Sequence, residues 1–177
     1  MVVNLAKQII EDTSKENMVI AIWWKRAIAF VLDVIFVLGI LVLLTRGRIT
    51  FAWELNILIE NPSETILWFL VNWLLIFSAF WLYFKYSGRI MQRSLGQRFL
   101  KLAIIYGDGT MMPEKNWEKR AFYKLRYLLP VIGIILGILD LIKIMNSETH
   151  QSRIDWYTNT IVVMDWSLPS EIRVLLK

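Results

Sequence analysis

The sequence has no cysteine and a single histidine, and these two shortages exclude several kinds of site. Without cysteine the chain cannot form a disulfide, a thiolate metal site or a cysteine nucleophile. His150 alone cannot build a histidine-rich metal cluster, and it lies in a polar stretch, MNSETHQSR, that is typical of a loop. We therefore expect no enzymatic activity, no metal and no cofactor.

Long apolar runs, in contrast, are plentiful. Of the 177 residues, 56% are hydrophobic. Residues 27–44, 66–86 and 127–145 each have about the 17 to 25 residues that cross a hydrocarbon core. A soluble protein of this length has too little other surface to cover three such helices. The sequence predicts an all-α integral membrane protein of about three transmembrane helices.

The basic residues predict how the chain is oriented in a cell membrane. Residues 87–126 hold nine basic residues against three acidic ones, whereas residues 45–65 hold two against three. Loops rich in Lys and Arg stay in the cytoplasm, so residues 87–126 and the N-terminus are expected there. Anionic lipid is the partner expected at this basic loop, and it accounts for the charge without a nucleic-acid partner.

An arginine and an aspartate interrupt the first apolar run, RAIAFVLDVIF. Seven residues turn a helix through about 700°, so Arg26 and Asp33 lie on one face about 10 Å apart. Ala29 lies between them, and its small side chain allows another element to approach closely. Asp33 is too deep and too short to reach water, so it is expected to face the protein interior, as a structural hydrogen-bonding group or as an ion or proton site.

The third apolar segment carries its own acid. Asp140 lies three residues before Lys143, which favours an ion pair on the helix surface. Pro130, Gly133 and Gly137 are residues that bend or break such a helix.

Three motifs, in the right order, resemble those of the RDD family of small membrane proteins. Arg26, Ala29 and Asp33 fit R-x-x-A-x-x-x-D in the first membrane helix. SLGQRFLKLAII, at 94–105, resembles the family's TxGKRLLGLRVV segment and is followed by a DG turn. HQSRIDWYTNTIVV, at 150–163, resembles the closing RxxLHDKLAGTxVV segment.

The resemblance covers residues 22–164 and divides the chain into an N-terminal surface segment at 1–22, a membrane domain at 23–164 and a tail at 165–177. The residues that give the family its name are here Arg26, Asp33 and Asp155. Ser94, Gln97 and Ile154 replace the family's Thr, Lys and His, so no role of that Lys or His transfers to this chain.

The course of the third segment allows two arrangements. Three full crossings, the favoured arrangement, place residues 146–177 outside. In the alternative, KLAIIY and TIVVM pair as short strands at the cytoplasmic face, where Arg26 and Asp155 also meet. That pairing requires the third segment to return to its own side as a broken or re-entrant hairpin near Pro130.

Two functions are consistent with these residues and with what the resemblance implies. The first is proton-coupled cation exchange by an oligomer, with Asp33 as the carrier, Arg26 beside it, and Asp155 or Asp140 as a second acidic station. The second is a non-catalytic accessory or regulatory subunit that binds a membrane partner or anionic lipid. Catalysis by an acid pair such as Asp33 and Asp140 would need apposed carboxylates, which nothing in their spacing brings together.

Overall fold

The computed structural model describes residues 18–49 and 62–176, so most of the predicted surface segment at 1–22 and part of the first loop lie outside the described residues. Helices and strands follow in the order α2 (Trp23–Leu44), α4 (Pro62–Met91), α5 (Leu95–Phe99), β1 (Leu102–Tyr106), α6 (Glu114–Lys124), η2 (Leu125–Leu128), α7 (Ile132–Asn146), α8 (Arg153–Tyr157), β2 (Thr160–Met164), η3 (Asp165–Ser167) and α9 (Ser170–Arg173). The predicted class, a helical membrane protein with a short β element, is confirmed.

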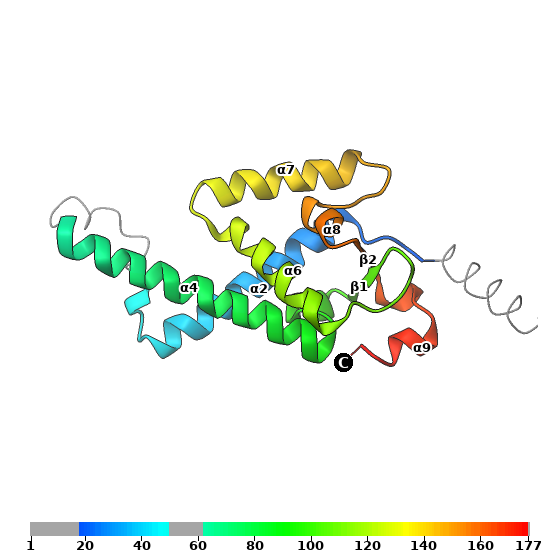
Figure 1. Cartoon of the computed structure of the whole chain (residues 1–177), viewed down its shortest axis with the longest axis horizontal. Coiled ribbons are helices and arrows are strands. Elements are labelled where there is room, and N and C mark those ends of the chain that lie inside the picture. Colours follow the sequence, from blue (N-terminus) through cyan, green and yellow to red (C-terminus); the bar gives the residue numbers. More distant parts are fainter. Residues whose placement is uncertain (1–17, 50–61, 177) are drawn as a thin grey trace, which may run out of the picture.

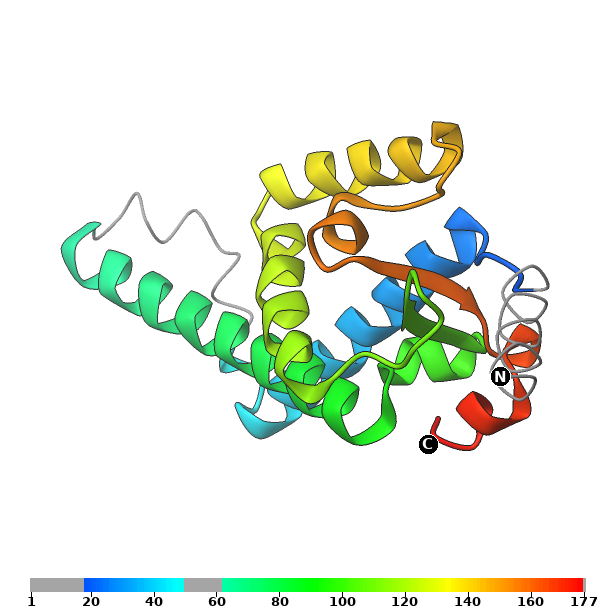
Figure 2. The same ribbon diagram turned by 45° about the vertical axis from the view of Figure 1, so that its right-hand side comes forward.

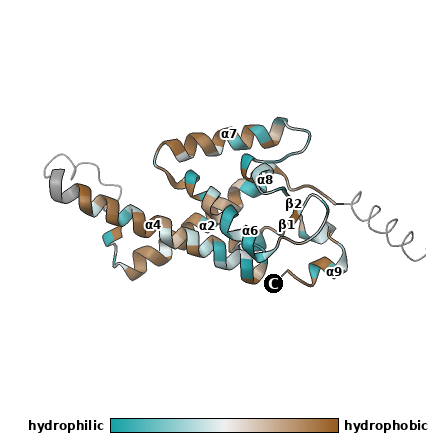
Figure 3. Cartoon of the chain, viewed as in Figure 1, coloured by the Kyte–Doolittle hydropathy of each residue, from teal (hydrophilic) through white to brown (hydrophobic). Residues whose placement is uncertain are grey.

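Two of the described helices, α2 and α4, are long and apolar enough to cross a membrane. The 22 residues of α2 extend about 33 Å, which matches a hydrocarbon core of about 30 Å. Both helices expose large apolar side chains along their length, for example Ile35 and Leu74. Figure 3 shows this apolar character over α2, α4 and α7, in contrast to the hydrophilic residues of α6.

The third apolar segment is broken rather than continuous. The α6–η2 segment and α7 meet at an angle of 115°, with Pro130 in the break. Val131 adopts a left-handed φ of 62°, and Gly133 lets the first turn of α7 approach η2, because a Cβ there would lie 2.3 Å from the Tyr127 carbonyl oxygen. With 15 residues, α7 extends only about 22 Å.

The two predicted strands pair. β1 and β2 are antiparallel, with Ile104 opposite Val162, and residues 19–21 hydrogen-bond along the other edge of β2. We call the end of the molecule formed by residues 18–22, α5, β1, α8 and β2 the sheet end. Figures 1 and 2 show α2 leaving the sheet end, α4 returning to it, and α7 running back to it after the break.

This pairing decides between the two predicted arrangements of the third segment. Three full crossings would separate β2 from β1 and from the start of α2 by the thickness of a bilayer, whereas the structure has them in hydrogen-bonding contact. The structure therefore has the hairpin arrangement rather than the three full crossings that were favoured. The break at Pro130 is the physical reason, because it reverses the chain before α7.

Three apolar clusters hold these elements together. One lies between α2, α4 and α6 and includes Ile76 and Phe80, which are fully buried. The other two lie on the two faces of the small sheet, with Ile104 and Trp117 on one face and Ile105 and Leu168 on the other. The sheet end is thus a packed unit, and Leu168 ties the segment after β2 into it.

The absence of native cysteine allows a direct test of the hairpin. We expect Ser170→Cys and Lys115→Cys to react with a membrane-impermeant maleimide from the same side of sealed vesicles. Arg48→Cys, at the far end of α2, should react from the opposite side. Joint labelling of positions 170 and 48 from one side would contradict the hairpin.

Candidate functional site

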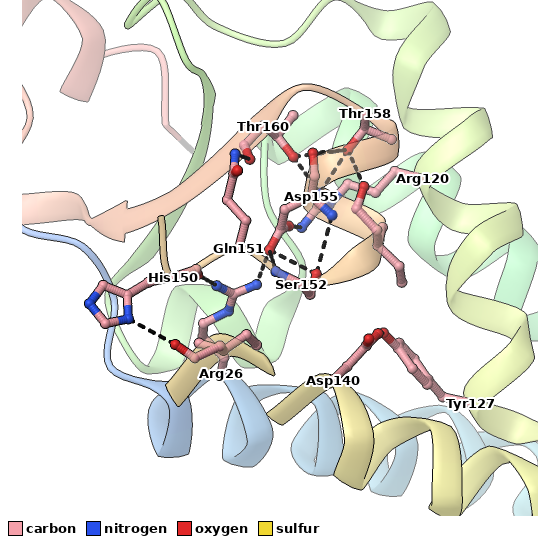
Figure 4. A network of polar contacts seen from close by, with 12 residues as sticks. Arg26, Arg120, Tyr127, Asp140, His150, Gln151, Ser152, Asp155, Thr158 and Thr160 are labelled. Carbon is pink, nitrogen blue, oxygen red and sulfur yellow. Dashed lines mark hydrogen bonds and ion pairs between the residues drawn. The ribbon is translucent and has the colours of Figure 1, made fainter. Parts of the chain in front are cut away.

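The most highly connected charged group of the described residues is the carboxylate of Asp155, which is fully buried. The Arg26 guanidinium forms an ion pair with Oδ2, and the Arg120 guanidinium donates to Oδ1 at 2.6 Å. The Ser152 hydroxyl and backbone N–H both donate to Oδ2, at 2.8 and 3.0 Å. Figure 4 shows Arg26 and Arg120 reaching this carboxylate from different elements.

Asp155 is held in place by the first turn of α8. Ser152 caps this helix and accepts a hydrogen bond from the Asp155 N–H, while the Asp155 side chain accepts from the Ser152 N–H, which completes a capping box. Arg26 comes from α2 and also donates to the His150 carbonyl oxygen at 2.9 Å. Three distant parts of the chain therefore converge on one acid.

Arg120 extends this network onto the sheet. Its second terminal nitrogen donates to the hydroxyl oxygens of Thr158 and Thr160, at 3.1 and 2.6 Å. Thr160 is the first residue of β2 and is fully buried. A single side chain of α6 thereby connects α8 and β2.

The two arginines govern the protonation of Asp155. Burial raises the pKa of this carboxyl, but the charges of Arg120 and Arg26 outweigh burial and hold the pKa well below its usual range. Asp155 is therefore ionised at neutral pH.

Asp33 lies in a second, separate site and is also almost fully buried, at 1% exposure. The Tyr83 hydroxyl donates to its Oδ1 at 2.6 Å, and the Ser94 hydroxyl donates to Oδ2 at 2.6 Å. The Gly96 N–H adds a third hydrogen bond to Oδ1 at 2.8 Å. These donors come from α4 and from the first turn of α5, so Asp33 joins three helices.

The close contact predicted beside Ala29 is made by α5. A Cβ on Gly96 would lie 2.1 Å from the Ala29 carbonyl oxygen, so only glycine allows this approach. The approach brings the Gly96 N–H to Asp33. The small residue on α2 and the glycine on α5 therefore act together to place Asp33 in its hydrogen bonds.

Asp140 forms ion pairs with Arg126 and Arg153, and not with Lys143 as predicted. Arg126 donates to Oδ2 at 2.7 Å, and the Tyr127 hydroxyl donates to the same oxygen. The prediction was wrong because the bend at Pro130 turns α7 back over η2, and Asp140 then faces residues 13 and 14 positions earlier. Lys143 is exposed instead.

A cavity of about 310 Å³ lies between α2, α6 and α7. Its polar lining includes two of the predicted site residues on α2, Arg26 and Asp33, and one on α7, Asp140. The fourth, Asp155, contacts Arg26 and Arg120 behind the cavity wall. The structure thus places the four predicted residues around one region. Arg26 and Asp33 have different partners there: Arg26 pairs with Asp155, and Asp33 accepts hydrogen bonds from α4 and α5.

Sequence reasoning missed several residues of these networks. Arg120 and Arg126 were counted only as members of the basic loop, and Tyr83 only as an aromatic residue near a helix end. Ser94 and Gly96 stood inside the SLGQ motif, which marked the segment but not its contact with Asp33. Spacing along one helix contains no information on partners that come from other elements.

Comparison with known proteins gives one match. A model of the RDD family matches residues 20–159, which is well over half of the chain. The matched range includes both long helices and the break at Pro130. It also includes all four predicted site residues, Arg26, Asp33, Asp140 and Asp155. No curated protein and no solved structure matches the chain.

Removal of the Asp155 charge should destabilise the protein strongly. Asp155→Asn leaves Arg26 and Arg120 buried without their carboxylate, and we expect a loss of about 3–5 kcal/mol. Asp165→Asn removes a less buried ion pair, with Arg93, and should cost about 1 kcal/mol. Thermal unfolding of the purified proteins in detergent measures both.

Wild type and Asp155→Asn should also differ in how their stability depends on pH. Because the pKa of Asp155 is lowered on folding, its contribution is complete above about pH 4 and declines as the pH falls further. Wild type should therefore lose more stability in acid than Asp155→Asn, whose amide does not titrate. Equal acid sensitivity would contradict this assignment.

The contact of α5 with α2 gives a further prediction. Gly96→Ala forces a Cβ against the backbone of Ala29, and we expect a loss of about 1–3 kcal/mol. Gly39→Ala is the matched control on α2, because a Cβ there meets no atom within 4 Å. Thermal unfolding should show the control at or slightly above wild type.

Proposed function

The chain belongs to the RDD family, and from the geometry of its charged residues we propose that it is a non-catalytic accessory subunit of a membrane-bound partner protein. The family and the apolar helices make it a membrane protein. The proposal concerns what this membrane protein does there.

The observation that carries the proposal is that both carboxylate oxygens of Asp33 are held by hydrogen bonds from the chain itself. Its two oxygens accept three hydrogen bonds, from Tyr83, Ser94 and Gly96, in a site that is 1% exposed. A carboxylate that carries protons or cations must exchange partners with its cargo. Asp33 instead fixes α5 against α2 and α4. Asp155 is likewise fixed, by ion pairs with Arg26 and Arg120, so both acids of the family motif hold elements of the fold together.

An exposed aromatic patch on α6 and α8 supports a protein partner. It consists of Phe122, Tyr123, Trp156 and Tyr157. The Tyr123 and Tyr157 rings stack with centroids 5.4 Å apart, and the Trp156 ring lies 5.3 Å from that of Tyr157. Aromatic residues are enriched in protein interfaces, where they bury much area at little cost in side-chain entropy.

The distribution of charge supports a location of the sheet end in the cytoplasm, with the protein in the cell membrane. The basic stretch 87–126 contains α5, β1 and α6. Basic segments next to membrane helices stay on the cytoplasmic side and attract anionic lipid. In this orientation the aromatic patch is available to a partner at the cytoplasmic face.

Cation and proton transport is the second candidate, and Asp140 is the observation that favours it. Its Oδ1 is buried and accepts no hydrogen bond from the described residues, although the Arg153 Nε lies 3.5 Å away. Asp140 also lines the cavity that Asp33 lines. A transporter of this kind would be oligomeric, because one chain supplies few spans.

A flux assay separates the two functions. We expect folded wild type in proteoliposomes to give no proton flux above protein-free vesicles under imposed Na⁺, K⁺ or Li⁺ gradients, followed with an internal pH dye. Flux that depends on a cation and is lost in a folded Asp140→Asn or Asp33→Asn protein would overturn the accessory proposal in favour of transport.

Recovery of an assembly tests the accessory proposal positively. Wild type purified from native membranes in mild detergent should migrate as a defined complex with a stoichiometric second protein. Trp156→Ala and Tyr157→Ala should dissociate it at least tenfold more readily, whereas Phe99→Ala, an exposed aromatic residue on α5, should not. Migration of wild type as the chain alone would contradict the proposal.

A further inference from the structure

The cavity between α2, α6 and α7 has an apolar mouth. Val31, Ile134 and Ile138 line it and are each more than half exposed, at 53%, 67% and 52%. They lie on α2 and α7, whose residues are mostly apolar (Figure 3). In a membrane this mouth opens sideways toward acyl chains rather than toward water.

The inner end of the cavity is basic. Arg120 lines it, and its Nε is buried without a hydrogen-bond partner among the described residues. Lys124 also lines it, and its Nζ lies over the Phe84 ring, 4.1 Å from the centroid, with no carboxylate within 4 Å in the part of the chain that the structure describes. Arg120 is already paired with Asp155, whereas the half-buried Lys124 ammonium has no such partner within residues 18–49 and 62–176, so an incoming anion would pair with it.

The charges around the cavity do not balance. Five basic residues line it or pair with its lining, against three carboxylates: Arg26, Arg120, Lys124, Arg126 and Arg153 against Asp33, Asp140 and Asp155. Asp155 and Asp140 are each shared by two arginines, and Asp33 is bonded to neutral donors. Two positive charges therefore remain in excess.

We infer that this cavity binds the headgroup of one anionic phospholipid, which enters from the bilayer between α2 and α7. A volume of about 310 Å³ is at the lower end of the range for small-molecule pockets and suits a headgroup with its phosphate. The phosphate lies at Lys124 and Arg120, and the acyl chains stay at the apolar mouth. This site does not depend on a partner protein, so it holds whether or not the accessory proposal does.

Two substitutions test the site in different ways. Lys124→Gln removes the unpaired charge. Gly137→Phe adds a ring at a residue of α7 that lines the cavity, where an added Cβ meets no atom within 4 Å. Lys119→Gln removes an exposed charge from the same helix, and Gly39→Phe adds the same ring to α2 away from the cavity. These two are the matched controls.

The measurement is native mass spectrometry of the purified full-length chain in neutral detergent, titrated with phosphatidylglycerol, phosphatidylcholine or inorganic phosphate. We expect one saturable phosphatidylglycerol adduct, bound about tenfold more tightly than phosphatidylcholine. Lys124→Gln and Gly137→Phe should weaken it by about tenfold, with unchanged circular dichroism, and the two controls should bind as wild type.

Three outcomes would overturn the inference. Equal affinity for phosphatidylcholine would remove the role of charge. An equal loss in Lys119→Gln would assign the binding to general surface attraction. Displacement of phosphatidylglycerol by inorganic phosphate at the same concentration would make the ligand a free anion and not a lipid.

Discussion

The fold depends on one buried carboxylate shared by two arginines. Asp155 binds Arg26 from the first membrane helix and Arg120 from the amphipathic helix α6, and its own capping box fixes it on α8. Each charge alone would be costly away from water, and the cluster is stable because all of them are present together. The apolar packing of the sheet end surrounds this network.

Asp33 performs a similar task with neutral partners. Ala29 and Gly96 let α5 come close enough for a backbone N–H and a serine hydroxyl to reach the carboxylate. These hydrogen bonds hold the short helix α5 against the long helices α2 and α4. The two acids, Asp33 and Asp155, thus hold the elements that surround the cavity in fixed positions.

The sequence predicted those features that depend on spacing along one element. Two of the three apolar runs are long helices, KLAIIY and TIVVM are strands, and Ala29 is a point of close approach. The meeting of Arg26 with Asp155 was predicted only for the hairpin arrangement, which was not the favoured one, because three full crossings would have placed residues 146–177 outside. The partner of Asp140 was predicted wrongly, and Arg120 was missed. Those contacts depend on how a broken hairpin folds back, and helix periodicity does not contain that information.

The separation of partners along the chain has a consequence for biosynthesis. During translation, the partners of Asp33 on α5, Ser94 and Gly96, follow it by 61 and 63 residues. Asp155, the partner of Arg26, follows it by 129 residues. The first membrane helix thus enters the bilayer with two polar side chains, Arg26 and Asp33, whose partners have yet to be translated. Until Asp155 has been translated, α2 is therefore an incompletely paired segment within the membrane.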